Sequence, residues 1–529
     1  MTSTPHASLN RRIIQSAGIV IASVLLSRIL GFAREWTVAH EFGSNAVTDA
    51  YYAAFTLPDF LNYLVAGAFL SLTFIPVLTR CIAENREEDG WRVFSTVISF
   101  MGLALVGLVI VGEVCAPELV TAIAPGFRAS ERDHVIFLTR LMLPAQIFFY
   151  EGGILSAVQY AKGQFVVPSL APLIYNIAII LGGVLLASQL GITGFAVGVL
   201  AGAFTGNFLL QIYGARRAGA RYLPNLHILH PDFGFFVKLT IPIMLAFSIV
   251  FTDDWIIRFF GSYLVPASIT WLTYAKNLMR VPLGVVGQAV GVAAFPFLAQ
   301  LYAEKRFEEL NHTINATLKG LMLILLPISA LTIAESRPLV YMVFSHTRLR
   351  PPDLDATAAT LEFFSLGMFA WGAQNIVARG FYAARDTLTP AISGTVMTVL
   401  TLPVYWFLSR RMEHLGLALA SSIGVIAYTA VLFVLLNRRI QNAESTALLV
   451  FLLKMGIAST IGALACREVA SLLEARVHWQ SAHDAFLVVL GASAVGFMVT
   501  GAGAKALGVR ELGIYMRKLV PRLWPASKT

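Results

Sequence analysis

The sequence predicts an all-α polytopic membrane protein with about fourteen transmembrane helices. Of its 529 residues, 57% are hydrophobic and only 13% are charged, which exceeds what the core of a soluble protein requires. Apolar stretches of about 20 residues, the length that crosses a hydrocarbon core of about 30 Å as a helix, recur from Ile13 to Ala506. The connections between them are short, so we expect no large soluble domain.

The expected helices follow one another closely along the chain. Their predicted ranges are 13–34, 48–79, 93–114, 136–161, 166–188, 193–214, 235–260, 267–300, 312–335, 356–384, 388–409, 415–437, 446–472 and 483–506. The first resembles a secretory signal, but its apolar run is too long and no A-x-A site follows it, so we expect an uncleaved helix. The longest outer loops, near 115–135, 337–355 and 473–482, are too small to be enzymes, and no catalytic residue is predicted.

The net charge of +9 comes from basic residues that are distributed by membrane side and do not cluster on one nucleic-acid-binding face. If the N-terminus is cytoplasmic, roughly twice as many Lys and Arg fall on that side as on the other, as the positive-inside rule requires. The residues assigned to it are Arg11, Arg12, Arg80, Arg86, Arg92, Lys162, Arg216, Arg217, Arg221, Lys305, Arg306, Arg385, Arg438, Arg439, Lys505, Arg510, Arg517, Lys518, Arg522 and Lys528. Both termini are therefore predicted to be cytoplasmic, with no nucleic-acid partner.

The sequence contains no motif for a metal site, a disulfide framework or a nucleotide-binding site. Cys81, Cys115 and Cys466 are too scattered for a disulfide framework, and no CxxC or HExxH spacing occurs. A GxxxxGK[ST] motif is also missing, so we expect neither a cofactor nor direct use of ATP. The remaining energy sources are the membrane potential or a gradient of Na⁺ or H⁺.

An internal repeat links distant parts of the chain. Tyr160-Ala161 is followed by Pro168, and Tyr382-Ala383 by Pro390, the same spacing displaced by 222 residues. A second sequence match at this offset pairs Tyr52-Ala53 with Tyr274-Ala275. Chance is the alternative, because these residues are common.

A repeat of six helices is even-numbered, so both copies enter the membrane from one side and form a parallel repeat about an axis along its normal. We therefore predict two six-helix lobes, at 1–222 and 223–445. Two further helices and a basic cytoplasmic tail would occupy 446–529.

Helix breakers fall at corresponding places in the two lobes. They are Pro58, Gly67 and Pro76 in the second helix, and Pro282, Gly284, Gly287, Gly291 and Pro296 in the eighth. Irregular backbone at membrane depth is tolerated where it lines a cavity, so paired breaks point to a transport site. Kinking for packing alone is the other interpretation.

Two arginines of the first helix are candidate binding residues. A charge at bilayer depth costs roughly 2.5 to 3.5 kcal/mol or more, so it rarely faces lipid. Arg28 is deep enough to require a partner, whereas Arg34, nearer the outer end, could extend to the interface. Asp49 could balance either arginine when no ligand is bound, or it could cap the next helix together with Thr48.

The second lobe supplies further candidates just before the Pro282 break. Lys276 and Arg280 are one helical turn apart, and the alternative for them is a structural ion pair with Asp253, Asp254 or Glu362. With the first-helix arginines they would make a cavity suited to a polyanion, because guanidinium groups bind phosphate oxygens bidentately. Asp253 and Asp254 are also candidates for a coupling cation or proton, unless Arg258 neutralises one of them.

Several segments resemble the MurJ (MviN) family of lipid II flippases, within the multidrug/oligosaccharidyl-lipid/polysaccharide exporter superfamily. They are SRILGFARE at 27–35, TDAYYAAFTLPDFL at 48–61, FIPVL at 74–78, FVVPSLAPLIYN at 165–176, YAKNLMRVPLG at 274–284 and FYAARDTLTP at 381–390. The resemblance covers nearly the whole chain, in order and at family spacing.

The resemblance implies an alternating-access flippase of the bacterial inner membrane. Its cargo would be lipid II, the undecaprenyl-diphosphate-linked disaccharide-pentapeptide used for peptidoglycan synthesis, moved to the periplasmic leaflet. Arg28, Arg34 and Asp49 match first-lobe residues of the family, and helices 13 and 14 match its lipid-tail groove by position. Membrane lipids and cell-wall synthesis proteins are the other partners implied. The alternatives are an exporter of another polyprenyl-diphosphate glycan and a cation-coupled drug exporter.

The chain also departs from the family pattern. Asn62-Tyr63 stands where many members have a second-helix arginine, and Gly67 replaces a common acidic residue. Asn277 occupies the position of the eighth-helix arginine, with Lys276 beside it and Arg280 one turn on. We interpret this as a relocated charge and include Asn62 and Asn277 among the candidate substrate-binding residues.

Overall fold

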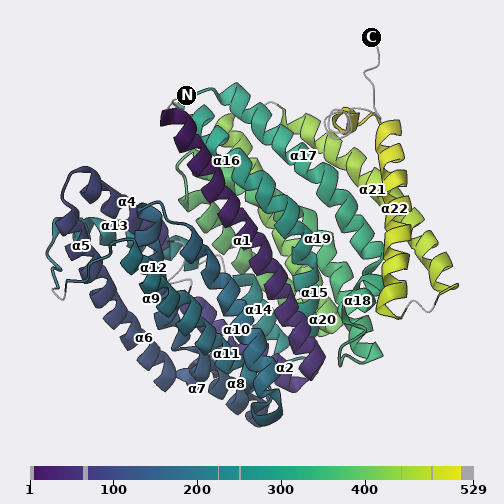
Figure 1. Cartoon of the computed structure of the whole chain (residues 1–529). Helices are drawn as coiled ribbons and strands as arrows, with labels where there is room; N and C mark the ends of the chain where they lie inside the picture. Colours follow the sequence, from purple (N-terminus) through teal and green to yellow (C-terminus); the bar gives the residue numbers. More distant parts are fainter. Residues whose placement is uncertain are drawn as a thin grey trace. The chain divides into compact units, whose positions relative to one another are not determined.

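The computed structural model describes residues 5–62, 69–223, 226–248, 252–442, 444–477 and 480–513. In these ranges every regular element is a helix (Figure 1), which confirms the all-α class. The chain divides into two compact units, Met1–Pro266 and Ala267–Thr529.

The first unit begins with a long helix that is followed by many shorter ones. Its α-helices are α1 (Pro5–Phe42), α2 (Ala46–Ala54), α3 (Thr56–Leu61), α4 (Phe69–Ala83), α5 (Glu87–Thr96), α6 (Gly102–Val114), α7 (Ala116–Ile123), α8 (Ala129–Met142), α9 (Ala145–Ala161), α10 (Val166–Leu190), α11 (Thr193–Gly202), α12 (Leu210–Arg217), α13 (Pro231–Ser248) and α14 (Thr252–Gly261). Two π-helical segments, η2 (Val97–Met101) and η3 (Ala203–Leu209), join α5 to α6 and α11 to α12.

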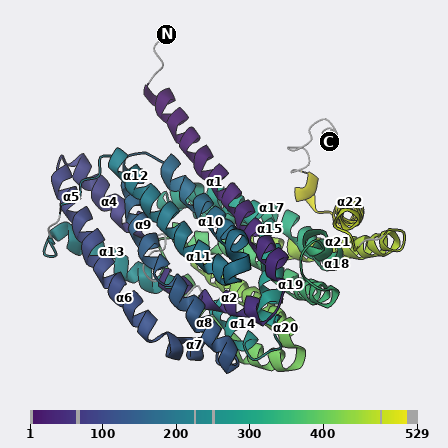
Figure 2. The same cartoon turned by 60° about the horizontal axis from the view of Figure 1, so that its bottom comes forward.

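The second unit has fewer and longer helices. They are α15 (Ser268–Pro282), the π-helical η4 (Leu283–Gly287), α16 (Gln288–Ala303), α17 (Phe307–Ala334), α18 (Ser336–Phe344), α19 (Pro351–Ala383), α20 (Leu388–Ile440), α21 (Ser445–Glu474) and α22 (Ala482–Ala506). α21 and α22 lie side by side in both views (Figures 1 and 2). α20 contains the predicted eleventh and twelfth helices, which are separated by the non-helical backbone of Glu413.

Within the described ranges, eight helical segments are long and apolar enough to cross a membrane by length and composition. They are Glu87–Val114, Ala129–Ala161, Val166–Leu190, Thr193–Arg217, Phe307–Ala334, Leu388–Ile440, Ser445–Glu474 and Ala482–Ala506. The total of fourteen transmembrane helices stays a prediction, because several expected spans are divided into shorter helices.

The breaks expected near Pro58 and Pro282 are present. The predicted helix 48–79 is divided into α2, α3 and α4, and Pro58 lies in the first turn of α3, where its missing N–H leaves no hydrogen bond unmade. The predicted helix 267–300 becomes α15, η4 and α16, with Pro282 as the last residue of α15. Gly67 lies outside the described residues, as do Tyr63 and the tail residues Arg517, Lys518, Arg522 and Lys528.

The first helix is longer than the sequence indicates. α1 continues to Phe42 because no breaker interrupts it before Gly43, which has a positive φ of 68°. Arg34 is therefore not near the end of its helix, since about two further turns follow it. The expectation that Arg34 reaches an interface from a helix end is wrong in this respect.

Left-handed backbone recurs at matched positions and supports the internal repeat. Apart from Gly508, the described residues with positive φ form five pairs separated by 220 to 224 residues. The pairs are Gly43 and Ala267, Asn85 and Lys305, Gly163 and Arg385, Gly191 and Glu413, and Gly219 and Gln441. Because each residue of a pair ends or joins helices, the two copies share their turns as well as their sequence spacing.

The predicted seventh helix, 235–260, is divided into α13 and α14, which belong to the first compact unit. Asp232 at the start of α13 forms ion pairs with Arg80 of α4 and, at 3.4 Å, with Arg86. These contacts hold the beginning of α13 against the end of α4. The lobe ranges 1–222, 223–445 and 446–529, which come from the repeat, stay a prediction.

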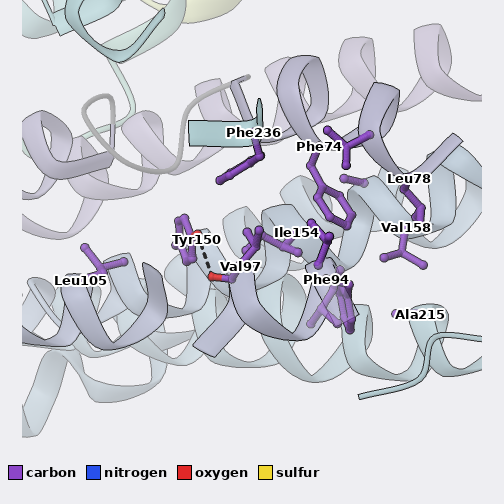
Figure 3. Packing of buried hydrophobic residues seen from close by; sticks show 14 of the residues in the cluster. Phe74, Leu78, Phe94, Val97, Leu105, Tyr150, Ile154, Val158, Ala215 and Phe236 are labelled. Carbon is purple, nitrogen blue, oxygen red and sulfur yellow. Dashed lines mark hydrogen bonds between the residues drawn. The ribbon is translucent and has the colours of Figure 1, made fainter. Parts of the chain in front are cut away.

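A buried hydrophobic cluster of the first unit lies around α4 and α9. Phe74 and Leu78 of α4 are fully buried near Ile154 and Val158 of α9 (Figure 3). The Tyr150 hydroxyl donates to the carbonyl of Val97 at 3.5 Å, where the π-helical η2 leaves the regular pattern. In a membrane such contacts stabilise mainly through van der Waals packing, because lipid tails are as apolar as these side chains.

Candidate functional site

Arg34 and Glu35 of α1 form the centre of a polar cluster in the first unit. The Arg34 guanidinium donates to Glu35 Oε1 from Nη2 at 2.6 Å and from Nε at 3.1 Å. The Arg34 side chain is 25% exposed and that of Glu35 is 7% exposed. Arg34 is thus neutralised by its neighbour and is still accessible from one side.

Two further helices complete the cluster. Tyr52 of α2 donates its hydroxyl to Glu35 Oε2 at 2.7 Å, so both carboxylate oxygens are occupied. On α10, Asn176 places Oδ1 at 3.5 Å from Arg34 Nη1 and donates from Nδ2 to the carbonyl of Pro172 at 2.8 Å. The first contact is long for a hydrogen bond, so Nη1 remains a weakly used donor.

The backbone around α2 fixes Tyr52 in place. Asn45 caps the helix through Oδ1, which accepts from the N–H groups of Val47 at 2.8 Å and Thr48 at 3.2 Å. Thr48 Oγ1 accepts from the Asn45 N–H at 2.9 Å, which completes a capping box. Asp49 does not take part in this box. It is buried in the first turn, where a negative charge is favoured by the helix dipole.

Tyr51 packs beside the cluster. Its ring makes edge contacts with Tyr52 at 5.4 Å and Phe55 at 5.1 Å between centroids, and its side chain is only 1% exposed. Its hydroxyl has no hydrogen-bond partner among the described residues. This makes Tyr51 a useful comparison for Tyr52, whose hydroxyl is engaged.

A second ion pair lies between α3 and α14. Arg258 Nη1 is 3.5 Å from Asp59 Oδ2 and donates to Thr56 Oγ1 at 2.9 Å. The sequence suggests Arg258 as a partner of Asp253 or Asp254, whereas the ion pair seen here is with Asp59. Asp253 and Asp254 lie half-buried in the first turn of α14, and both have interaction partners.

Arg28 differs from Arg34 in its surroundings. It is exposed on α1, next to the exposed Ile29, and it has no ion pair or hydrogen bond within the described part of the chain. The expectation that Arg28 needs a protein partner is not met in this state, while Arg34 has one. A role for Arg28 in binding stays a prediction.

The candidates of the second unit lie in different environments. Lys276 is buried, and its Nζ lies 5.8 Å from the centre of the Phe364 ring of α19. Asn277 is half-buried and Arg280 is exposed. Glu362, a suggested partner, accepts from Ser336 Oγ at 2.7 Å. Lys276 therefore contacts an aromatic face, and Arg280 lies at the exposed end of the same helix.

Asn62 follows α3 directly and is half-buried. Its backbone N–H donates to the carbonyls of Pro58 and Asp59, so the residue ends that short helix. Within the described residues, no group of three or more His, Cys, Asp or Glu is arranged to hold a metal ion.

Sequence reasoning identified Arg34 but did not include the residues near it among the candidate binding residues. These residues are Glu35, Tyr52, Asn176, Asp59 and Arg258, of which Arg258 was considered only as a partner of Asp253 or Asp254. A signal for them was available, because each is a polar residue inside a largely apolar helical stretch and four of them lie in the segments that resemble the family. Their pairing was not available, since it depends on how α1, α2, α3, α10 and α14 pack.

Comparison with known proteins identifies relatives along most of the chain. The family model described as "Lipid II flippase MurJ" matches residues 38–489. A protein of Burkholderia cenocepacia named "Lipid II flippase MurJ" is 28% identical over 428 residues, covering 78% of this chain and 82% of that protein. A "Probable lipid II flippase MurJ" of Haemophilus influenzae is 26% identical over 514 residues, covering 92% and 98%.

Solved structures share the fold. "Lipid II flippase MurJ, inward closed conformation" matches with a TM-score of 0.76 at 22% identity, covering 95% of this chain and 99% of that one. An inward-facing multidrug resistance transporter of the MATE family and MOP superfamily matches with a TM-score of 0.64 at 16% identity, covering 81% and 99%. Because the family model spans most of the sequence, the chain belongs to the MurJ family of lipid II flippases, which are transporters and not enzymes.

Proposed function

We propose that this protein moves lipid II from the cytoplasmic to the periplasmic leaflet of the bacterial inner membrane by alternating access, with both termini cytoplasmic. Membership of the family supports the cargo. The observation that supports a binding role within this chain is the Arg34 cluster. It places a neutralised, partly accessible guanidinium on a helix of a membrane protein.

The cargo presents a physical problem that such a cluster can solve. A diphosphate that enters hydrocarbon without partners faces a desolvation cost of the order of tens of kcal/mol, so spontaneous flipping is negligible. A guanidinium offers paired N–H donors that match phosphate oxygens. Replacing water by such donors lowers the barrier without any covalent chemistry.

Arg34 is suited to exchange partners when the cargo arrives. Glu35 holds it through one carboxylate oxygen, while Tyr52 holds the other oxygen of Glu35. The long contact from Arg34 Nη1 to Asn176 is the one that a phosphate oxygen would replace. Glu35 would then keep the arginine in place, and a second charge of the diphosphate would need cations elsewhere.

Those further contacts are assigned to the other predicted residues. In this proposal Arg28, Asp49 and Asn62 belong to the first-lobe half of the headgroup site, and Lys276, Asn277 and Arg280 to the second-lobe half. The lipid tail would bind along α21 and α22, which correspond by position to the groove helices. Cell-wall synthesis proteins would be the partners that use the cargo.

The driving force belongs to the proposal as well. Moving one charge through 100 mV is worth about 2.3 kcal/mol, so the membrane potential can drive a charged cargo or a bound ion. Asp253 and Asp254 are the proposed site for a coupled Na⁺ or H⁺. A coupled ion must bind the inward and outward states with different affinity in order to shift them.

The test is complementation of a strain depleted of its own lipid II flippase. Arg34→Ala removes the paired donors and should lower transport about 10- to 100-fold, since a charge-assisted hydrogen bond contributes about 1.5 to 3 kcal/mol. Transport by Arg34→Lys should lie between that of the wild type and that of Arg34→Ala, because the charge remains and the planar donor pair is lost. Arg348→Ala, at an exposed arginine outside the helices, is the matched control.

Arg34→Ala leaves Glu35 with an unpaired charge, so the variant Arg34→Ala/Glu35→Gln separates loss of binding from loss of folding. It should insert normally and still fail to support growth. Growth at the wild-type rate with either variant would remove Arg34 from the site. Normal peptidoglycan together with loss of another surface glycan in the depleted strain would instead assign a different polyprenyl-diphosphate cargo.

A further inference from the structure

We propose that α20 carries a binding site for the phosphate headgroup of an anionic membrane phospholipid. The site is the aromatic–arginine patch, which consists of Trp406, Phe407, Arg410 and Arg411. The Arg410 guanidinium carbon lies 4.5 Å from the centre of the Trp406 ring, and that of Arg411 lies 5.7 Å from the centre of the Phe407 ring. Both rings are exposed, Trp406 by 49% and Phe407 by 53%.

The charge of the patch is not balanced within the protein. Arg410 and Arg411 are both exposed, and neither has an ion pair with any acid in the described ranges. Glu413 is the nearest acid in the sequence and is itself exposed and unpaired there. A guanidinium that stacks on a ring keeps its N–H donors in its own plane, where they can bind phosphate oxygens.

The neighbouring surface favours a phospholipid as the occupant. The first half of α20 exposes Ile392, Val396, Val399 and Leu400, each by half or more of its surface. This apolar face leads along the helix to the patch, so acyl chains can lie on it while the phosphate reaches the arginines. Trp at a membrane interface, with an apolar body and a polar edge, fits the same position.

The internal repeat shows that the fold does not require the patch. The residues 222 positions earlier, at the end of α10, are Val184, Leu185, Ser188 and Gln189, and all four are exposed. The following turns are alike, since Gly191 has φ 56° and ψ −142° and Glu413 has φ 50° and ψ −129°. The same helix end is therefore built once with neutral residues and once with an arginine pair on aromatic rings.

The predicted topology adds a reason to look for a ligand. It places the turn after residue 409 on the outer side, where the positive-inside rule disfavours two adjacent arginines. A bound lipid phosphate offsets that charge. The proposal depends on insertion of α20 in a membrane and not on the identity of the transported cargo.

The experiment titrates purified full-length protein in dodecyl maltoside with dioleoyl phosphatidylglycerol and counts bound lipid by native mass spectrometry. Arg410→Ser/Arg411→Gln installs the residues of the first copy and should weaken binding of this lipid about 30-fold, since each arginine near an anionic lipid contributes about five-fold. Arg348→Ser/Arg350→Gln removes the same charge from a loop in which neither arginine lies over a Trp, Tyr or Phe ring of the described residues, and it should leave binding unchanged. Dioleoyl phosphatidylcholine should bind weakly to all forms.

A transplant makes the test independent of any loss of folding. Val184→Trp/Leu185→Phe/Ser188→Arg/Gln189→Arg should add one phosphatidylglycerol site to the end of α10. Unchanged binding after Arg410→Ser/Arg411→Gln, or equal loss in the loop control, would overturn the proposal. Displacement of phosphatidylglycerol by an equimolar polyprenyl diphosphate would also overturn it, because the patch would then serve the cargo lipid.

Discussion

At the scale of residues, the central finding is that Arg34 is held by Glu35 and that Tyr52 in turn holds Glu35. From the sequence, the need of a membrane-embedded charge for a partner applies most strongly to Arg28, and Arg34 could instead extend to the interface. Asp49 was the suggested partner for either arginine, whereas the structure pairs Arg34 with the adjacent Glu35. Local spacing did not suggest this pair, because adjacent residues on a helix do not normally face each other.

Tyr52→Phe tests this arrangement. It removes the hydroxyl that donates to Glu35 Oε2, and leaving a buried acceptor unsatisfied costs about 1 to 3 kcal/mol. The melting temperature of the purified protein should fall, and transport should fall with it. Tyr51→Phe is the matched control, since the Tyr51 hydroxyl has no partner in the described residues and its loss should change little. Equal effects of the two substitutions would contradict the assignment.

At the scale of elements, the sequence predicted where the helices break and not how. Proline positions located the interruptions near Pro58 and Pro282, because proline removes a backbone donor. The start of α2 depends on the Asn45 cap, which the pattern of apolar residues does not reveal, and the division between α2 and α3 lies at Phe55. The π-helical segments η2, η3 and η4 were not predicted, because apolar periodicity does not distinguish a π-helical turn from an α-helical one.

Asn45→Ala should loosen α2 and, with it, Tyr52. Loss of an N-cap side chain costs about 1 kcal/mol of helix stability. This cost matters for α2 because the helix has only 9 residues. Hydrogen exchange of the α2 amides should rise and transport should fall, while Asn45→Asp, also a good cap, should keep both near the wild-type values. Unchanged exchange in Asn45→Ala would show that packing alone fixes this helix.

The turn between α19 and α20 gives a pH-dependent prediction. Burial raises the pKa of Asp386, but hydrogen bonds from Thr389 and the nearby Arg439 guanidinium outweigh it, so the pKa lies below its usual value. A carboxylate with a lowered pKa stabilises the folded state above its unfolded pKa of about 3.9, and this stabilisation is lost as the pH falls through the folded value. Asp386→Asn should therefore lower the melting temperature more at pH 7 than at pH 3. An equal loss at both pH values would contradict this account.

At the scale of the whole molecule, composition and hydropathy were sufficient for the fold class, because a membrane imposes helices of defined length on an apolar chain. The repeat was also visible in the sequence, and the paired left-handed turns support it. The grouping of α13 and α14 with the first unit could not be predicted from the sequence, since it depends on contacts such as those of Asp232 with Arg80 and of Arg258 with Asp59. Such ion pairs join residues far apart in the chain.

The most direct measurement is translocation by the purified protein in liposomes that contain lipid II with a fluorescent label on its headgroup. External dithionite reduces only the label in the outer leaflet, so flipping appears as loss of the protected inner-leaflet signal. We predict rapid loss with the wild-type protein, slower loss with Arg34→Ala, and no acceleration for a labelled phospholipid that lacks a diphosphate. Loss of the lipid II signal no faster than in protein-free liposomes would contradict the proposed function.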